Sequence, residues 1–226
     1  MNEVESYITR LSAWAPGISS SGEWDEWALG KRDIKPGVKG PEILFTDPLF
    51  RRRLSQISRM TIQVIHDLLP VGEGAKIIFL SFGGEISRQF QINKMLIKEN
   101  TLSPAAFSLS VYNAPVALAT MALGLKGGYA ALFPVKDAFS GGLIAAEAAL
   151  FSGAADELIF VYADEEVPPE YECFSRECPT PAAFALLLSR VSLPLSIPLL
   201  PLKRDDDTPL DFLKRLLLGR EIHVSP

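Results

Sequence analysis

The chain has 226 residues, of which 48% are apolar, so it can build a buried core in one large domain or two small ones. It carries 22 Lys and Arg residues against 27 Asp and Glu residues, so it lacks the basic excess typical of nucleic-acid-binding proteins. Its uninterrupted apolar stretches fall well short of the roughly 18 residues of a membrane-spanning helix, and its N-terminus shows no signal-peptide pattern. We therefore expect a globular, cytoplasmic protein with no nucleic-acid partner and no membrane span.

Residues for metal binding or redox chemistry are scarce. The sequence has two histidines, His66 and His223, at distant points, and two cysteines, Cys173 and Cys178, whose spacing matches neither a redox pair nor a zinc knuckle. It also lacks the glycine-rich phosphate loops, the zinc-hydrolase motif and the nucleophile-elbow motif. We expect no metal and no cofactor, and we interpret His66, which falls in a helical pattern, as a structural residue.

The N-terminal third mixes turn signals with one long helical pattern. Three tryptophans, a proline and a serine run indicate that 11–30 is a loop leading into a short helix capped near Ser21. Apolar residues then recur at steps of three and four from Pro48 to Pro70, which predicts one amphipathic helix. Its polar face has a cluster of arginines, which we interpret as solvated: Arg51, Arg52, Arg53 and Arg59.

Beyond residue 74 the pattern is typical of an α/β protein. Short apolar runs predict buried strands at 75–81, 129–135, 158–162 and 182–191. Helical patterns lie between the first three of these strands, at 85–98, 113–124 and 140–150, and 105–112 fits either a helix or irregular structure. Three prolines predict that 193–202 is an edge strand or an extended segment. Thr208-Pro209 and Gly219 predict the start and the end of a last helix. We expect one domain over 1–226, a layered sheet with covering helices.

Three short motifs, which serve as landmarks below, follow one another along the chain. They are Ser103-Pro104, Gly124-Leu125-Lys126-Gly127 and Gly153-Ala154-Ala155-Asp156-Glu157. With them, the segment 103–165 resembles the N-terminal half of β-ketoacyl synthases, the thiolase-fold condensing enzymes of fatty-acid and polyketide synthesis. The resemblance implies a thiolase-like fold for the whole chain.

The nucleophile of that family is missing from this sequence. In such enzymes the catalytic cysteine lies nine residues after the GLKG turn and seventeen before the next glycine landmark, and both counts reach Lys136. Acyl transfer to a lysine would give a stable amide, which prevents turnover. The family's two catalytic histidines come from a C-terminal half that would begin where this sequence ends. The resemblance therefore implies that the chain is not an enzyme on its own.

This combination resembles the chain-length-factor partners of type II polyketide systems. Within that group, 107–115 and 161–165 are similar to shortened ketosynthase-like proteins of bacterial aryl polyene pathways. The resemblance implies a heterodimer with a full-length ketosynthase, an acyl carrier protein bound by the complex, and a role in shaping the acyl tunnel.

The resemblance also assigns residues to the interface and the tunnel. The family pairs the strand before the nucleophile turn across a two-fold axis, which here gives Tyr129, Ala131, Phe133 and Val135. The family's residue near the Ser-Pro segment reaches into the partner's tunnel, which here gives Ala106 or Phe107, with Ser110 and Asn113 nearby. Our hypothesis is that the small Ala106 leaves room for a long, rigid chain and sets product length by steric exclusion.

Alternatives remain open at this point. Ala106 is also compatible with plain core packing, and the chain with a purely structural role in stabilising a ketosynthase. A third possibility is a small acyltransferase or hydrolase that uses Ser140 or Cys173, although the sequence shows no histidine placed as their base.

Overall fold

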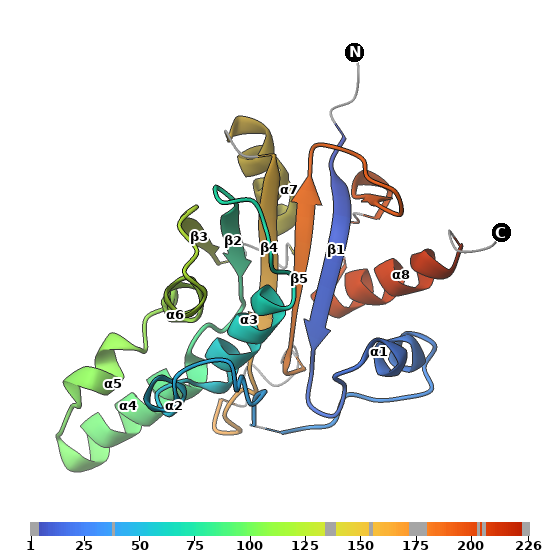
Figure 1. Ribbon diagram of the computed structural model, residues 1–226. Coiled ribbons are helices and arrows are strands. Elements are labelled where there is room, and N and C mark those ends of the chain that lie inside the picture. Colours follow the sequence, from blue (N-terminus) through green and yellow to red (C-terminus); the bar gives the residue numbers. More distant parts are fainter. Residues whose placement is uncertain are drawn as a thin grey trace.

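The computed structural model describes residues 5–37, 39–133, 139–153, 156–171, 180–202, 204 and 207–222. Within these ranges a six-stranded sheet has the order β3-β2-β4-β5-β1-β6 (Figure 1). The strands are β1 (Tyr7–Trp14), β2 (Lys76–Leu80), β3 (Tyr129–Leu132), β4 (Glu157–Asp164), β5 (Ala182–Ser189) and β6 (Ile197–Pro198). Strand β2 pairs in parallel with β3 and β4, whereas β5 is antiparallel to both β4 and β1. The predicted α/β class is confirmed, with a mixed sheet.

Helices cover both faces of this sheet. They are α1 (Ser21–Ala28), α2 (Pro48–Arg51), α3 (Gln56–His66), α4 (Ile86–Glu99), α5 (Pro104–Ser108), α6 (Ala114–Leu123), α7 (Phe139–Ser152) and α8 (Pro209–Ile222). Helices α3 and α6 lie on one face and α7 and α8 on the other, whereas α4 and α5 extend away from the sheet (Figure 1). No helix in the described ranges is long and apolar enough to cross a membrane.

The core forms two layers because side chains alternate along each strand. On β2, Ile77 and Phe79 pack toward α3 and α6, and Ile78 and Leu80 pack toward α7. Helix α7 approaches β2 closely at Gly142, where an added Cβ would lie 2.7 Å from the Leu80 side chain. This contact agrees with the small residues of the predicted helix at 140–150.

Strand β1 was not predicted, because the sequence indicated a loop from residue 11 onward. The strand is formed by pairing with β5 along its length, and its residues are mostly half-buried, without a clear period-2 alternation. The short helix that follows is confirmed, with Ser20 as its N-cap. The predicted edge at 193–202 is also confirmed, because β6 is the outermost strand and pairs with Tyr7 and Ile8.

Two helix boundaries differ from the prediction. The single helix expected from Pro48 to Pro70 is divided into α2 and α3, because the Ser55 hydroxyl accepts the Ser58 amide and starts a new helix. Helix α8 continues past Gly219 to Ile222. A glycine ends a helix when it adopts a left-handed conformation, as Gly124 does after α6 with a φ of 66°, and Gly219 has no positive φ.

Candidate functional site

The carboxyl ends of β2, β3 and β4 lie at one edge of the sheet. These strands are parallel neighbours, so their carboxyl ends lie side by side. Ligands of open α/β sheets bind at this edge, so we expect a functional site here. The nearby segment 104–113, which includes α5, carries the residues that the sequence assigned to the tunnel.

Asp164, the last residue of β4, fixes the turn that follows β2. Its buried carboxylate accepts the Ser81 hydroxyl at 2.7 Å and the amides of Phe82 and Gly83 at 3.0 and 2.9 Å. Burial raises the pKa of Asp164, against the effect of these hydrogen bonds, which favour the charged form. The carboxylate therefore ties the end of β2 to the end of β4.

Glu165 connects the same strand to two helices. Its carboxylate accepts the amide of Ser87 at 2.9 Å and the amide of Ile57 at 3.4 Å, in the first turns of α4 and α3. Burial raises the pKa of Glu165 to about 7, and the negative charge of Glu85 adds to the effect. Glu165 therefore titrates near neutral pH while it anchors both helix starts.

Glu85 precedes α4 and is fully buried. One carboxylate oxygen accepts the hydroxyls of Ser55 and Ser58 at 2.7 and 2.6 Å, and the other lies 3.1 Å from Nε of Arg88. A buried carboxylate needs such partners to offset its lost hydration. The N-terminus of α4 is thus held to the body of the protein by charged groups.

We expect Glu165→Gln to change how stability depends on pH. A folded-state pKa of about 7, against an ordinary 4.5, means that the folded protein binds this proton more tightly than the unfolded chain. Proton binding by Glu165 therefore makes its full contribution to the free energy of unfolding below about pH 4.5, and this contribution is lost as the pH rises through 7. The free energy of unfolding of the wild type, minus that of Glu165→Gln, should fall by up to about 3 kcal/mol between pH 4.5 and 8.

Denaturant titrations of both proteins across that pH range measure this difference. Groups that titrate alike in both proteins cancel in the subtraction. A difference that stays constant with pH would show that Glu165 has an ordinary pKa.

A cavity of about 540 Å³ lies beside these carboxylates, between α4, α5 and the segment 165–170. Its apolar lining includes Phe90, Ile92, Met95, Ala106, Val167 and Pro168. Nine polar or charged residues also line it: Ser55, Gln56, Ser87, Arg88, Gln91, Lys94, Glu165, Glu166 and Glu170. Ala106 is half-buried and lines this cavity, whereas the next residue, Phe107, is 56% exposed. The two alternatives for the tunnel residue therefore lie in different surroundings.

The other two residues assigned near the tunnel support the local structure. Ser110 is buried, and its hydroxyl donates to the carbonyl of Phe107 at 2.8 Å. Asn113 is the N-cap residue of α6, and its side-chain amide donates to the hydroxyl of Tyr129 at 2.9 Å. Asn113 therefore contacts the first residue of the strand assigned to the interface.

Strand β3 is the outer strand of the sheet on this side. The Ile77 amide donates to the carbonyl of Gly128, so the alternation of a parallel ladder directs the amides and carbonyls of Tyr129 and Ala131 away from β2. Both side chains are half-buried, and Phe133 is 64% exposed. The described part of the chain places no strand on this outer side of β3.

Residues 24–208 match the family model of the β-ketoacyl synthase N-terminal domain. The chain belongs to this family. A chain from the structure of the ketosynthase ApeO in complex with its chain length factor ApeC from Xenorhabdus doucetiae is similar to it, with a TM-score of 0.69 and 28% identity. That match covers 84% of this chain and 81% of the other. The predicted resemblance to ketosynthase and chain-length-factor proteins is thus confirmed.

More distant structures share the fold alone. The ishigamide ketosynthase/chain length factor has a TM-score of 0.64 and 13% identity, over 82% of this chain and 62% of the other. A chain from the AntDE:AntF complex, a type II PKS acyl-carrier protein in complex with its ketosynthase, has a TM-score of 0.60 and 13% identity. That match covers 82% of this chain and 63% of the other. This chain spans less than two thirds of both. A search of the curated proteins finds no significant match.

Several residues that sequence reasoning singled out lie outside the described residues. They are Val135, Lys136, Cys173, Cys178 and His223. Of the two alternative nucleophiles, Ser140 is described and is buried in the first turn of α7. His66, the one histidine in the described ranges, lies in α3 on the opposite face of the sheet, with its ring stacked on Phe45 at 3.7 Å. His66 is therefore not placed to act as a base for Ser140.

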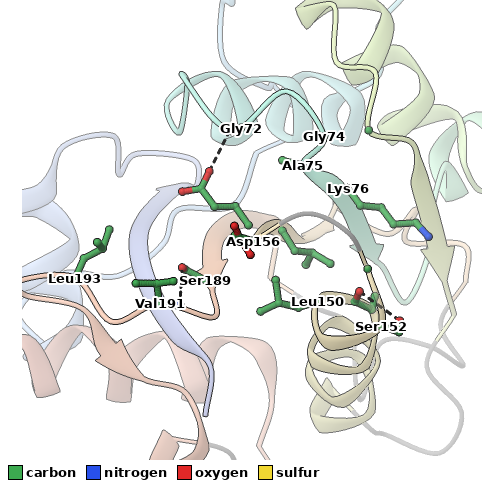
Figure 2. Close-up of a pocket in the computed structure, with 15 residues that line it drawn as sticks. Gly72, Gly74, Ala75, Lys76, Leu150, Ser152, Asp156, Ser189, Val191 and Leu193 are labelled. Atoms are coloured by element: carbon green, nitrogen blue, oxygen red, sulfur yellow. Dashed lines mark hydrogen bonds between the residues drawn. The ribbon is translucent and has the colours of Figure 1, made fainter. Parts of the chain in front are cut away.

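The ketosynthase landmarks around the glycines are explained by packing at the other edge of the sheet. An added Cβ at Gly127 would lie 2.2 Å from the carbonyl oxygen of Ala75. Gly127 and Gly153 line a second cavity, of about 870 Å³, at the amino ends of β2 and β4. Figure 2 shows this cavity, with Gly72 donating its amide to the Glu157 carboxylate at 3.0 Å. These landmarks therefore identify the fold rather than the site.

Sequence reasoning gave no role to the residues that hold the site together. Asp164 and Glu165 have a readable signal, because an acidic pair directly after a buried strand places two carboxylates at the carboxyl edge of the sheet. Glu85 has a weaker signal, at the start of a helix after two glycines. Tyr112, between α5 and α6, has no local signal, since its contacts come from distant strands.

Proposed function

We propose that this chain is a non-catalytic chain-length-factor subunit. It pairs with a full-length β-ketoacyl-ACP synthase and shapes the acyl tunnel of that enzyme in type II polyketide or aryl polyene biosynthesis. The observation that carries this proposal is the open outer edge of β3, in a chain that is 28% identical to one from a ketosynthase–chain length factor complex. The complex, rather than this chain alone, would bind an acyl carrier protein.

The edge of β3 favours pairing with another protein. Unpaired amides and carbonyls on an outer strand are a template for a further strand, and proteins normally cover or charge such an edge. Large apolar side chains are exposed on the segments that contact or follow β3, with Phe133 directly after the strand and Met121 on α6. Exposed apolar groups around an open strand are typical of a protein interface. A strand of the partner ketosynthase would satisfy the backbone groups and cover these side chains.

The cavity beside α5 supports a role in measuring the acyl chain. Ala106 is the smallest side chain in the apolar lining of that cavity, so it leaves space that a larger residue would fill. The apolar part of this mixed lining, on α4, α5 and 167–169, is where the end of an extended acyl chain would pack. The proposed tunnel of the ketosynthase would then end within this subunit, and the side chains of the cavity would limit product length.

Ala106→Phe should shorten the product. The phenyl ring would fill much of the space beside α4, so chains should stop at least one extension step earlier than in the wild type. Mass spectrometry of the products of the reconstituted complex measures this change.

Ala105→Phe is the matched control, because it introduces the same ring at an exposed position of the same helix. Product length that is unchanged in Ala106→Phe, with the complex intact, would reject the tunnel role and leave a purely structural partner of the ketosynthase.

A further inference from the structure

Tyr112 joins the ends of two neighbouring strands. Its hydroxyl accepts the amide of Ser81 at 3.1 Å and lies within hydrogen-bond distance of the carbonyls of Ser81 and Leu132. Leu132 is the last residue of β3, and Ser81 directly follows β2. Burial raises the pKa of Tyr112, so the hydroxyl stays protonated and keeps its donor. One phenol therefore closes the β2–β3 ladder at its carboxyl end.

The ring of Tyr112 is held as firmly as its hydroxyl. It packs against Gly84, where an added Cβ would lie 2.7 Å from the ring and where φ is +57°. Edge-to-face contacts join it to Phe79 at 6.3 Å and to Phe133 at 6.1 Å between ring centroids. Such contacts restrict the orientation of the ring and bring it against the exposed Phe133.

Tyr112 also follows α5 closely in sequence, so it links two parts of the proposed interface. One part is α5, with Ala106 and Phe107, and the other is the end of β3 at Leu132 with Phe133 directly after it. Through Ser81, whose hydroxyl donates to Asp164, the same connection reaches the end of β4. A shift of β3 relative to Tyr112 would have to break these bonds, and Tyr112 lies four residues after the end of α5.

We propose that Tyr112 is a positioning residue that fixes the end of β3 against α5 and so sets both the affinity for the ketosynthase and the sharpness of product length. This inference rests on the proposed function. A strand that pairs across an interface must be held straight and in register before the partner arrives, because ordering it on binding would cost affinity. The hydroxyl supplies that order where the β2–β3 pairing ends.

Tyr112→Phe tests this role because it keeps the ring and removes the hydroxyl. In the chain alone, hydrogen exchange should rise about tenfold for the amides of Ala130 and Leu132, which point toward β2, since one strand-end hydrogen bond is lost. Exchange in β5 should stay unchanged. In the co-expressed complex, the Kd for the ketosynthase should rise about tenfold and the products should spread over neighbouring lengths.

Thr208→Ala provides the stability-matched control. Thr208 caps α8 through a reciprocal pair of hydrogen bonds with Asp211, far from β3 (Figure 1), so its loss lowers stability by a similar amount without touching the interface. If Tyr112→Phe and Thr208→Ala give the same Kd, the same products and the same exchange in β3, Tyr112 is only structural and the inference is wrong. If the wild type forms no complex, the proposed function fails, while the exchange measurement still decides whether Tyr112 holds β3.

Discussion

Ala131→Pro should abolish pairing with the ketosynthase while this chain stays folded. The amide of Ala131 points away from β2, so proline removes no hydrogen bond from the sheet of this chain. In the complex it removes a donor from the edge and places a ring where the partner strand would lie. We expect the Kd to rise by about a hundredfold or more, because a lost hydrogen bond adds to a steric clash.

Ala130→Pro is the informative contrast to that substitution. Ala130 is adjacent in the same strand, but its amide points toward β2, so proline there breaks the ladder within this chain. It should lower the free energy of unfolding by about 3 kcal/mol. Thermal unfolding and the affinity of the complex, measured on both variants, separate the two effects. A complex that survives Ala131→Pro at unchanged affinity would show that the ketosynthase does not pair with β3.

Gly127→Ala should be among the most destabilising single substitutions in the chain. The new Cβ would lie 2.2 Å from the backbone oxygen of Ala75, and a backbone group has no alternative rotamer to adopt. The loop before β2 or the start of β3 must move, and we expect a loss of about 3 kcal/mol in the free energy of unfolding. Urea unfolding followed by circular dichroism measures it.

Gly22→Ala makes the same chemical change in open space. No atom lies within 4 Å of the position where its Cβ would be, and Gly22 lies in the first turn of α1. Alanine is the better helix former, so this variant should be as stable as the wild type or slightly more stable. Equal stability of Gly127→Ala and the wild type would mean that the GLKG turn relaxes easily and that its glycine has another role.

Local signals in the sequence predicted those elements that local interactions determine. Ser103 caps α5, and Gly124 ends α6 in a left-handed conformation, both as expected, because caps depend on neighbouring residues only. Strand β1 could not be predicted in this way, since the partner that defines it lies some 175 residues away in β5. The end of α8 was also predicted wrongly, at Gly219, because a glycine permits a helix end but does not require one.

The sequence predicted only those residues of the candidate site that the family resemblance assigned. The resemblance directed attention to Ala106, Phe107 and the strand at Tyr129, and the structure shows Ala106 in a cavity and β3 at a sheet edge. It gave no role to Tyr112 or Glu165, because their importance comes from contacts between segments distant in sequence. The raised pKa of Glu165 likewise depends on its burial and on the nearness of Glu85, which no sequence pattern shows.

We expect this chain to work only as a partner of a ketosynthase. Co-expression with a full-length β-ketoacyl-ACP synthase, followed by size-exclusion chromatography with mass determination of the eluted species, tests this directly. We predict a one-to-one heterodimer that survives dilution to micromolar concentrations. A monomer or homodimer of this chain that leaves the ketosynthase unbound would rule out the chain-length-factor role.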